Sequence, residues 1–277
     1  MSEDTEQILG KNIWELENHI KEGQGDPRSR LALLRAYAQQ TALSEEALGI
    51  ASEDRAFLKV NERSRAGVLL LHGSTGGPSQ LKSLAEALHR SGFSVLCARM
   101  PAHPASDEEL STHSWRAWLV EAELRYRMLA VWCRQLHVIG FSFGASIALQ
   151  MNVRPRPRSL VLLAPAIHIH LGWRARVALA LGLHRSRWVR RRLGWKVEVL
   201  EGIEQARKSD WWQKTPLYGA ICRDDPRVDA SSLRFLRKQS SNKDTVLREF
   251  ESGGHVFLDG APKEALHEEV LKFLKER

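Results

Sequence analysis

The sequence predicts an α/β fold in which a mostly parallel sheet is covered by helices on both faces. From about residue 55 onward, short apolar runs alternate with longer amphipathic stretches. Runs that are apolar throughout are typical of strands buried on both faces, as in parallel sheets between two helical layers. The predicted strands are Ala56–Val60, Val68–Leu71, Ser94–Ala98, His137–Ile139, Leu160–Leu163, Leu217–Ile221 and Val246–Phe250.

The amphipathic stretches between these strands predict the covering helices. They are Ser79–Arg90, Thr112–Trp132, Phe143–Val153 and Ser231–Ser240, and Pro262–Lys275 closes the chain. A sheet of this kind carries its chemistry in the loops at the carboxyl ends of its strands. Candidate functional residues are therefore sought in those loops.

Residues 1–54 follow a different pattern and predict a helical extension. Apolar residues at helical spacing indicate a helix over 6–22, which the stretch Gly23–Pro27 breaks. Leu31, Leu34 and Ala38 indicate a second helix, and a short third one is expected to begin at Ser44 as its N-cap. The chain thus divides into an N-terminal helical extension (1–54) and an α/β domain (55–277) with an insert at about 166–214.

Composition excludes several classes of protein. The 277 residues are 43% hydrophobic and 27% charged, which suits a globular chain able to bury a full core. No apolar run approaches the ~18 residues of a membrane span, and the acidic, polar N-terminus does not resemble a secretory signal. The three cysteines have neither metal-site nor disulfide-framework spacing, so we expect a cytoplasmic protein without a metal ion.

One motif carries the chemistry. The predicted strand ending at Ile139 runs into Gly140-Phe141-Ser142-Phe143-Gly144 and then into a predicted helix. A G-x-S-x-G sequence between a strand and a helix is the context of a nucleophile elbow, a sharp turn that exposes the serine hydroxyl. The glycines are needed because side chains at their positions would collide with the neighbouring helix and strand. Ser142 is therefore the candidate nucleophile.

A serine hydroxyl needs a base, and the base needs an acid to orient it. Along the chain, the acid and then the histidine are expected to follow the elbow. His255 comes after Ser252-Gly253-Gly254, a flexible turn behind the last predicted strand, and is the candidate base. Asp225, after the strand Leu217–Ile221, is the candidate acid, with the adjacent Asp224 as the alternative.

A tetrahedral intermediate also needs backbone N–H donors for its oxyanion. One candidate is the N–H of Phe143, directly after the nucleophile. The other is the N–H of Ser74, in the loop His72–Pro78 that follows the strand Val68–Leu71. This glycine-rich loop lacks the lysine of a GxxxxGK[ST] phosphate loop and has no GxGxxG pattern, so phosphate binding is not expected there.

Together these elements resemble the α/β-hydrolase family, and within it the carboxylesterases and monoacylglycerol lipases. The resemblance spans roughly residues 55–277, and the residues that carry it are His72-Gly73, Gly76-Gly77, the elbow, Asp225-Pro226-Arg227-Val228 and Gly254-His255. It implies hydrolysis of carboxylic esters through an acyl-serine, without a metal ion or organic cofactor. Met100-Pro101-Ala102-His103 also resembles the family's loop at that place, without its usual Gly-His-Gly. Two departures stand out: the elbow continues Gly144-Ala145 where Gly-Gly is frequent, and Cys222-Arg223-Asp224-Asp225 stands where a glycine-containing turn is common.

In that family an insert such as residues 166–214 usually forms a lid or cap over the pocket. Here it carries eleven Lys/Arg against four Asp/Glu and five of the nine tryptophans, whereas residues 1–50 are acidic. The arginines, clustered from Arg185 to Arg192, are either solvated charges on a cap or a surface for anionic lipids or substrates. No nucleic-acid-binding fold accompanies them. Charge complementarity suggests that the acidic extension packs near this insert.

We therefore expect a serine hydrolase that cleaves carboxylic esters of short to medium acyl chains, some of them lipid-like. On the same three residues, a thioesterase or an acyltransferase is an alternative, because an acyl-serine does not reveal its leaving group or acceptor. A non-catalytic protein that binds anionic ligands or lipid surfaces is the alternative from another class. Nothing in the sequence indicates an oligomeric state.

Overall fold

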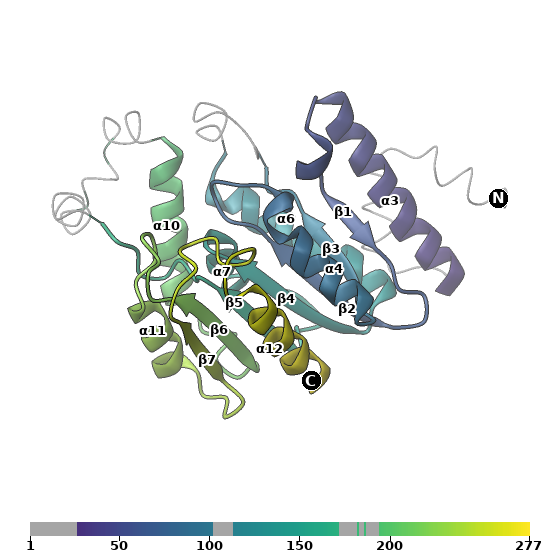
Figure 1. The fold of residues 1–277 in the computed structure, drawn as a ribbon. Helices are drawn as coiled ribbons and strands as arrows, with labels where there is room; N and C mark the ends of the chain where they lie inside the picture. The colour runs from purple at the N-terminus through teal and green to yellow at the C-terminus, as the bar shows by residue number, and fades with distance from the viewer. Residues whose placement is uncertain (1–26, 102–112, 172–181, 183–185, 187–193) are drawn as a thin grey trace.

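The computed structural model describes residues 27–101, 113–171, 182, 186 and 194–277 (Figure 1). The helix expected over 6–22, residues Ala102 and His103, and most of the arginine-rich stretch up to Arg192 lie outside these residues. Within the described part of the chain, no helix combines the length and the apolar character that crossing a membrane requires.

The seven predicted strands form one sheet, and each lies within two residues of its predicted bounds. Their order across the sheet is β1-β3-β2-β4-β5-β6-β7. All neighbours pair in parallel except β1, which runs antiparallel to β3 at the edge. The strands are β1 (Phe57–Lys59), β2 (Ala66–Leu71), β3 (Ser94–Ala98), β4 (Gln135–Phe141), β5 (Ser159–Leu163), β6 (Leu217–Cys222) and β7 (Val246–Phe250).

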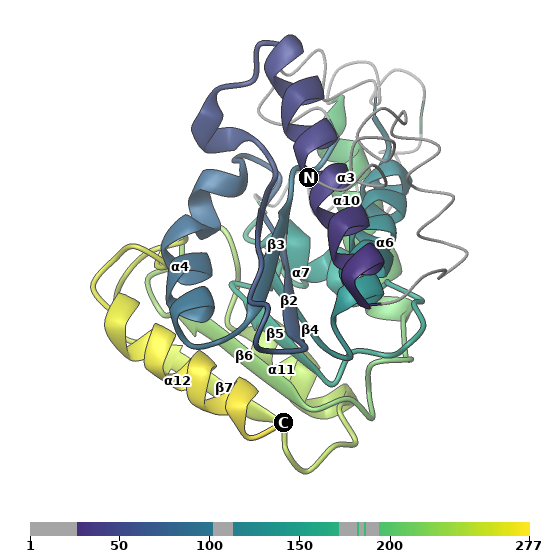
Figure 2. The same cartoon turned by 90° about the vertical axis from the view of Figure 1, so that its right-hand side faces the viewer.

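Helices cover both faces of the sheet, as predicted, and Figure 2 separates the two layers. On one side lie α4 (Lys82–Arg90) and α12 (Lys263–Lys275); on the other lie α6 (Trp115–Trp132), α7 (Phe143–Ala148), α10 (Trp195–Lys208) and α11 (Ser231–Gln239). The N-terminal helix α3 (Pro27–Ala47) packs against α6 and β1. Two short 3₁₀ helices, η1 (Ser52–Asp54) and η2 (Pro78–Leu81), complete the described elements.

The alternation of side chains along each strand divides the core into two halves. In β2, Val68 and Leu70 face the layer of α4 and α12, whereas Leu69 and Leu71 face the layer of α6 and α7. All four are fully buried. Burying one such side chain stabilises the fold by about 1.5–3 kcal/mol, so strands that are apolar on both faces stabilise both layers at once.

Several predicted helix bounds are wrong. The α-helices predicted from Ser79 and Thr112 begin at Lys82, after the 3₁₀ turn η2, and at Trp115. Ser44 does not begin a third helix, because α3 runs unbroken to Ala47; no glycine or proline between Ala38 and Ser44 interrupts it.

Helix α7 ends at Ala148 rather than at Val153. The Gln150 N–H donates to the Ile147 carbonyl instead of the Ser146 carbonyl, which accepts the Gln150 side-chain amide at 2.9 Å, so the regular α-helical bonding stops here.

The acidic residues of α3 pair with the α/β domain and the segment leading into it. Glu45 forms an ion pair with Arg99 at 3.0 Å, and Glu46 forms one with Arg55 at 3.2 Å. These partners, together with α6 and β1, hold α3 in the described structure. Most of the basic insert lies outside the described residues, so the expected packing of the acidic extension near it stays a prediction.

One polar side chain lies deep in the sheet. His137, which the sequence placed in an apolar strand, is 1% exposed, and its Nδ1 lies 2.8 Å from the Ser159 hydroxyl of β5. The edge of the ring meets the ring of Phe93 at a centroid distance of 5.8 Å. Burial, aided by the positive charge of Arg158, lowers the pKa of His137 to about 4, so this imidazole is neutral at pH 7.

We predict that His137 makes the fold sensitive to acid. In the unfolded chain the imidazole binds a proton near pH 6.5, whereas in the folded chain it does so only near pH 4. Stability is therefore complete above pH 6.5 and is lost as the pH falls through this window, by about 3 kcal/mol. Urea unfolding at pH 7 and pH 4 should show that His137→Leu loses less stability than the wild type. Equal losses in both proteins would contradict the prediction.

Candidate active site

The candidate site residues converge on one end of the sheet. Ser142 lies between β4 and α7, Asp225 follows β6, His255 follows β7, and Ser74 follows β2. All four strands are parallel, so their carboxyl ends meet at one edge, the upper side of Figure 1. That edge is where ligands bind in open α/β sheets.

Ser142 has a backbone conformation that side-chain-bearing residues avoid. Its φ is 54° and its ψ is −118°, between the last residue of β4 and the first residue of α7. Such a conformation costs about 1–3 kcal/mol and persists only where the surrounding structure holds it. Here the Ser142 N–H donates to the Leu163 carbonyl at 2.8 Å, and its carbonyl accepts from the Ala166 N–H at 3.2 Å. The turn is thereby fixed to β5 and to the loop that follows it.

The two glycines of the motif allow this turn. A Cβ on Gly140 would lie 2.5 Å from the Ala145 Cα, and a Cβ on Gly144 would lie 2.3 Å from the Leu71 carbonyl oxygen. Both distances are far inside van der Waals contact, and both obstacles are backbone atoms that cannot turn away. The predicted collision with neighbouring helix and strand is confirmed.

The hydroxyl of Ser142 and the side chains of His255 and Asp225 form a continuous hydrogen-bonded chain. Ser142 Oγ lies 2.9 Å from His255 Nε2, and His255 Nδ1 lies 2.9 Å from Asp225 Oδ2. The imidazole is 7% exposed and leans over the ring of Phe141, with centroids 5.3 Å apart. The structure thus brings together the three residues that the sequence selected.

The carboxylate of Asp225 is held from both sides. Its Oδ1 accepts the backbone N–H groups of Arg227 at 2.8 Å and Val228 at 2.9 Å, while Oδ2 faces the imidazole. Burial by itself would raise the pKa of this carboxyl. The hydrogen bonds from His255 and from the two N–H groups outweigh burial and hold the pKa below its ordinary value. Asp225 is therefore ionised at neutral pH.

Asp224, the alternative acid, does something else. Its Oδ1 accepts the Gly254 N–H at 2.9 Å and its Oδ2 accepts the Gly253 N–H at 3.2 Å. Both glycines have positive φ values, 145° and 64°, and they lead directly into His255. Asp224 thus fixes the turn that presents the imidazole. The sequence contains both parts of this contact, the second carboxylate and the Gly-Gly turn. It does not show that the two lie within hydrogen-bonding distance.

The two candidate oxyanion donors belong to residues that lie beside Ser142. We call residues 72–79 the glycine loop. A Cβ on its Gly73 would be 3.1 Å from the Ser142 Cβ, so the loop passes directly over the elbow. Ser74 and Phe143 line the same pocket as Ser142. Phe143 is the first residue of α7, where a helix leaves its N–H groups without an intrahelical acceptor.

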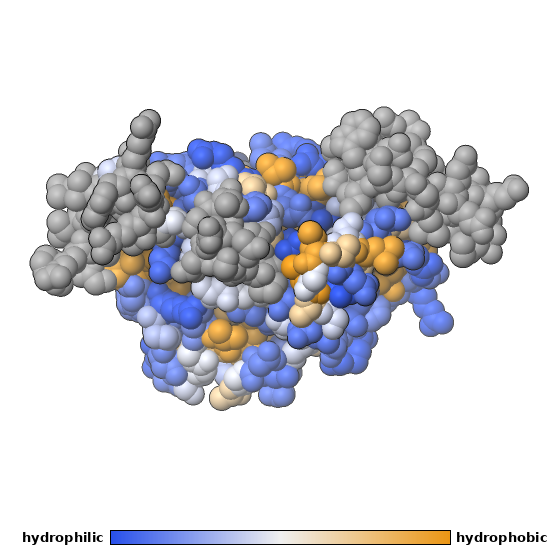
Figure 3. Space-filling view, turned by 90° about the horizontal axis from the view of Figure 1, so that it is seen from above, coloured by the Kyte–Doolittle hydropathy of each residue, from blue (hydrophilic) through white to orange (hydrophobic). Residues whose placement is uncertain are grey.

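A cavity of about 310 Å³ opens onto Ser142 and His255. This is at the lower end of the ~300–1,000 Å³ typical of small-molecule sites. One wall is apolar and comes mainly from α10, with Trp195, Val199, Leu200 and Ile203, and from Phe143. The lining also contains three basic side chains, those of His170, Lys196 and Arg227. Figure 3 looks down on this end of the molecule, where apolar side chains lie in patches beside the segments drawn in grey.

The apolar wall is a part of the site that sequence analysis did not resolve to residues. The insert was expected to cover the pocket, and α10 is the helix of the insert within the described residues. The helix packs against α7 through a close contact: a Cβ on Gly202 would lie 2.6 Å from the Phe143 ring. That contact joins the insert to the first residue after the nucleophile.

Comparison with known proteins also indicates an α/β-hydrolase fold. A sequence profile of the alpha/beta hydrolase fold family matches residues 68–216, more than half of the chain. A stretch of 90 residues is 32% identical to the thermostable monoacylglycerol lipase of Bacillus sp. (strain H-257). This match covers 32% of the chain and 36% of that lipase, so it spans about a third of the relative's length.

Solved structures share the fold over most of the chain. A structure reported for LipS and LipT, two metagenome-derived lipolytic enzymes, has a TM-score of 0.70 and 21% identity, and covers 82% of this chain and 99% of its own. The monoacylglycerol lipase of Paleococcus ferrophilus has a TM-score of 0.65 and 18% identity, with 79% and 97% covered. At these identities the likeness concerns the fold. With more than half of its length matched by the family profile, the chain belongs to the α/β-hydrolase fold family.

Proposed function

We propose that this protein hydrolyses carboxylic esters through an acyl-serine intermediate, with Ser142 as nucleophile, His255 as general base and Asp225 as the orienting acid. One observation carries the proposal: the buried hydrogen-bonded chain from Ser142 through His255 to Asp225, with both distances at 2.9 Å. These are the roles and contacts that activate a serine hydroxyl in acyl transfer. Family membership and the likeness of one stretch to a monoacylglycerol lipase support it.

The reaction follows from the geometry. His255 Nε2 takes the proton of Ser142 as Oγ attacks the ester carbonyl, and ionised Asp225 stabilises the imidazolium that results. The N–H groups of Phe143 and Ser74 donate to the oxyanion of the tetrahedral intermediate. His255 then protonates the departing alcohol, and a water molecule, activated by the same imidazole, releases the acid and restores Ser142.

The pocket supports an ester with a modest apolar acyl group. The α10 wall offers aliphatic and aromatic surface to a hydrocarbon chain, and about 310 Å³ suits short to medium chains better than long ones. The same acyl-serine could also pass its acyl group to a thiol or an alcohol. No feature of the described pocket favours these acceptors over water, so ester hydrolysis is the function that we propose.

We also propose that the pocket mouth favours substrates with negative charge. Lys196 and Arg227 are exposed there, and among the described residues no carboxylate pairs with either side chain. Arg227 instead donates to the Thr75 hydroxyl of the glycine loop at 2.9 Å. An anionic ester, or one presented at an anionic lipid surface, would place its charge beside these cations. The five arginines from Arg185 to Arg192 lie outside the described residues, and a role for them in binding anionic lipids stays a prediction.

The protein is further proposed to work in a reducing compartment such as the cytoplasm. Cys97, Cys133 and Cys222 are all buried and unpaired. Free, buried thiols are typical of proteins that are kept away from an oxidising environment.

We expect that Ser142→Ala abolishes ester hydrolysis. With p-nitrophenyl esters from acetate to palmitate, kcat/KM should fall by about 10⁵-fold or more, because no other group can form the acyl-enzyme. In the wild type the rate should peak at short to medium chains. Ser146→Ala is the matched control: this buried serine, four residues on, donates to the Ala166 carbonyl and does not itself line the pocket, so its loss should leave the acyl-enzyme chemistry intact. Hydrolysis that survives in Ser142→Ala would refute the assignment.

Adjacent aspartates allow the acid to be tested against a close control. Asp225→Asn removes the charge that stabilises the imidazolium and should lower kcat by about 10³–10⁴-fold. Asp224→Asn leaves that charge in place and weakens only the Gly253–Gly254 turn. Since one net hydrogen bond contributes about 1 kcal/mol, we expect a loss of about fivefold. A larger loss in Asp224→Asn than in Asp225→Asn would reverse the two roles.

If Lys196 and Arg227 attract anionic substrates, the preference for an anionic over a neutral ester should weaken with added salt. We compare p-nitrophenyl butyrate with mono-p-nitrophenyl succinate, which carries a carboxylate on its acyl chain. The ratio of kcat/KM, anionic over neutral, should fall about two- to fivefold in Lys196→Gln and in Arg227→Gln, as expected for exposed charge pairs. Lys208→Gln, an exposed lysine at the far end of α10, controls for net charge. A ratio unaffected by either mouth variant or by added salt would rule out the preference.

A further inference from the structure

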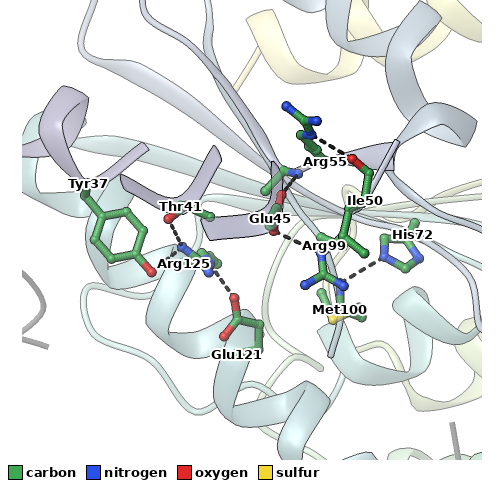
Figure 4. Close-up of polar contacts among 11 residues, drawn as sticks. Tyr37, Thr41, Glu45, Ile50, Arg55, His72, Arg99, Met100, Glu121 and Arg125 are labelled. Carbon is green, nitrogen blue, oxygen red and sulfur yellow. Dashed lines mark hydrogen bonds and ion pairs between the residues drawn. The ribbon is translucent and has the colours of Figure 1, made fainter. Parts of the chain in front are cut away.

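A buried carboxylate connects the N-terminal helix to the α/β domain. Glu45, near the end of α3, is 5% exposed. Its Oε2 accepts the Ala56 N–H at 2.7 Å and its Oε1 accepts the Arg99 Nε–H at 3.0 Å. A buried charge is tolerated only where it is paired and hydrogen-bonded. Both oxygens of Glu45 are thus committed, and Figure 4 shows its carboxylate between α3 and the start of the loop after β3.

From Arg99 the contacts continue to the glycine loop. The next residue, Met100, donates its backbone N–H to His72 Nε2 at 3.0 Å. Because an amide N–H can only donate, Nε2 must accept, and the imidazole carries its proton on Nδ1. Nδ1 lies 2.8 Å from the Gly73 carbonyl and donates to it. His72, 1% exposed, therefore joins the residue that follows Arg99 to the first glycine of the loop; Figure 4 shows the Met100 end of this connection.

The other end of the glycine loop is also held by the N-terminal segment. In η1, Asp54 Oδ1 accepts the Ser79 hydroxyl at 2.7 Å. A Cβ on Gly77 would lie 2.4 Å from the same oxygen, so the loop backbone passes directly against this carboxylate. Glu45 and Asp54 thus act at opposite ends of residues 72–79, and both come from the segment that precedes β1.

Small displacements of this loop matter to the proposed chemistry. The loop and the elbow are in contact, since a Cβ on Gly144 would lie 2.5 Å from the His72 carbonyl oxygen. The Ser74 N–H must point at the position of the oxyanion within a few tenths of an ångström to stabilise it. Misplacement by about 1 Å can cost a hundredfold in rate. A loop fixed at both ends keeps that donor in place.

We propose that residues 27–54 form a clamp on the glycine loop, with Glu45 and Asp54 as positioning residues that hold the oxyanion donor Ser74. The inference rests on the proposed function and assigns a role to the N-terminal extension. The clamp acts on the transition state, because neither carboxylate lines the substrate pocket. It should therefore affect kcat and leave KM nearly unchanged.

The test separates positioning from mere stabilisation. In Glu45→Gln and in Asp54→Asn, kcat should fall about tenfold with little change in KM. The inhibition constant of a trifluoromethyl ketone, whose adduct with Ser142 places an oxyanion in the same site, should rise by a similar factor. Arg125→Gln is the control: Arg125 of α6 also holds α3, through hydrogen bonds with Tyr37 and Thr41 (Figure 4). Among the described residues it donates a hydrogen bond to none of Glu45, Arg99 and His72. This substitution should lower Tm and spare kcat.

Asp54 offers a second test that does not depend on a buried residue. Asp54→Asn and Ser79→Ala weaken the same hydrogen bond, so the double variant should lose no more kcat than either single variant. The clamp would be overturned if Glu45→Gln and Asp54→Asn behaved like Arg125→Gln, with a lower Tm but unchanged kcat and inhibitor affinity. That result would leave the proposed hydrolase activity intact. A folded wild type inactive on every ester would overturn both.

Discussion

The positive φ of Ser142 costs free energy that the rest of the fold must supply, and most features of the site follow from that constraint. The turn is possible because Gly144 lets α7 approach the carbonyl oxygens of Leu71 and His72, closer than any side chain would permit. It is held because the Ser142 N–H donates to β5. A parallel sheet with both faces buried provides this rigid frame, and the apolar strands that predict it are those that fix the elbow.

Around this turn, each group to which we assign a catalytic role depends on a second group that orients it. His255 is set by Asp225 on one side and by the Gly253–Gly254 turn on the other, and Asp224 fixes that turn. Asp225 in turn is fixed by two backbone N–H groups. The same logic extends to the glycine loop and its proposed clamp. Precision at the nucleophile is thus distributed over β2, β6, β7 and the N-terminal segment.

Patterns in the sequence predicted those parts of the protein whose structure depends on neighbouring residues along the chain. Seven apolar runs identified the strands, and the spacing of Gly140, Ser142 and Gly144 identified the elbow. Patterns favoured Asp225 but left Asp224 open as the alternative acid, because adjacent carboxylates differ only in which way each side chain points once β6 ends. Nor could they place His137, which reads as part of an apolar strand, or Glu45, whose partner Arg99 lies 54 positions away. The environment of such residues depends on partners far away along the chain, and a single sequence does not show which residues pair.

The central claim is that the Ser142 oxygen forms the covalent intermediate. It is tested most directly by treating the folded protein with a fluorophosphonate and locating the adduct by mass spectrometry of peptides. The account predicts a single phosphonylated residue, Ser142, with labelling slowed strongly in His255→Ala because the hydroxyl then lacks its base. An adduct on another residue, or no adduct in a protein that still hydrolyses esters, would contradict it.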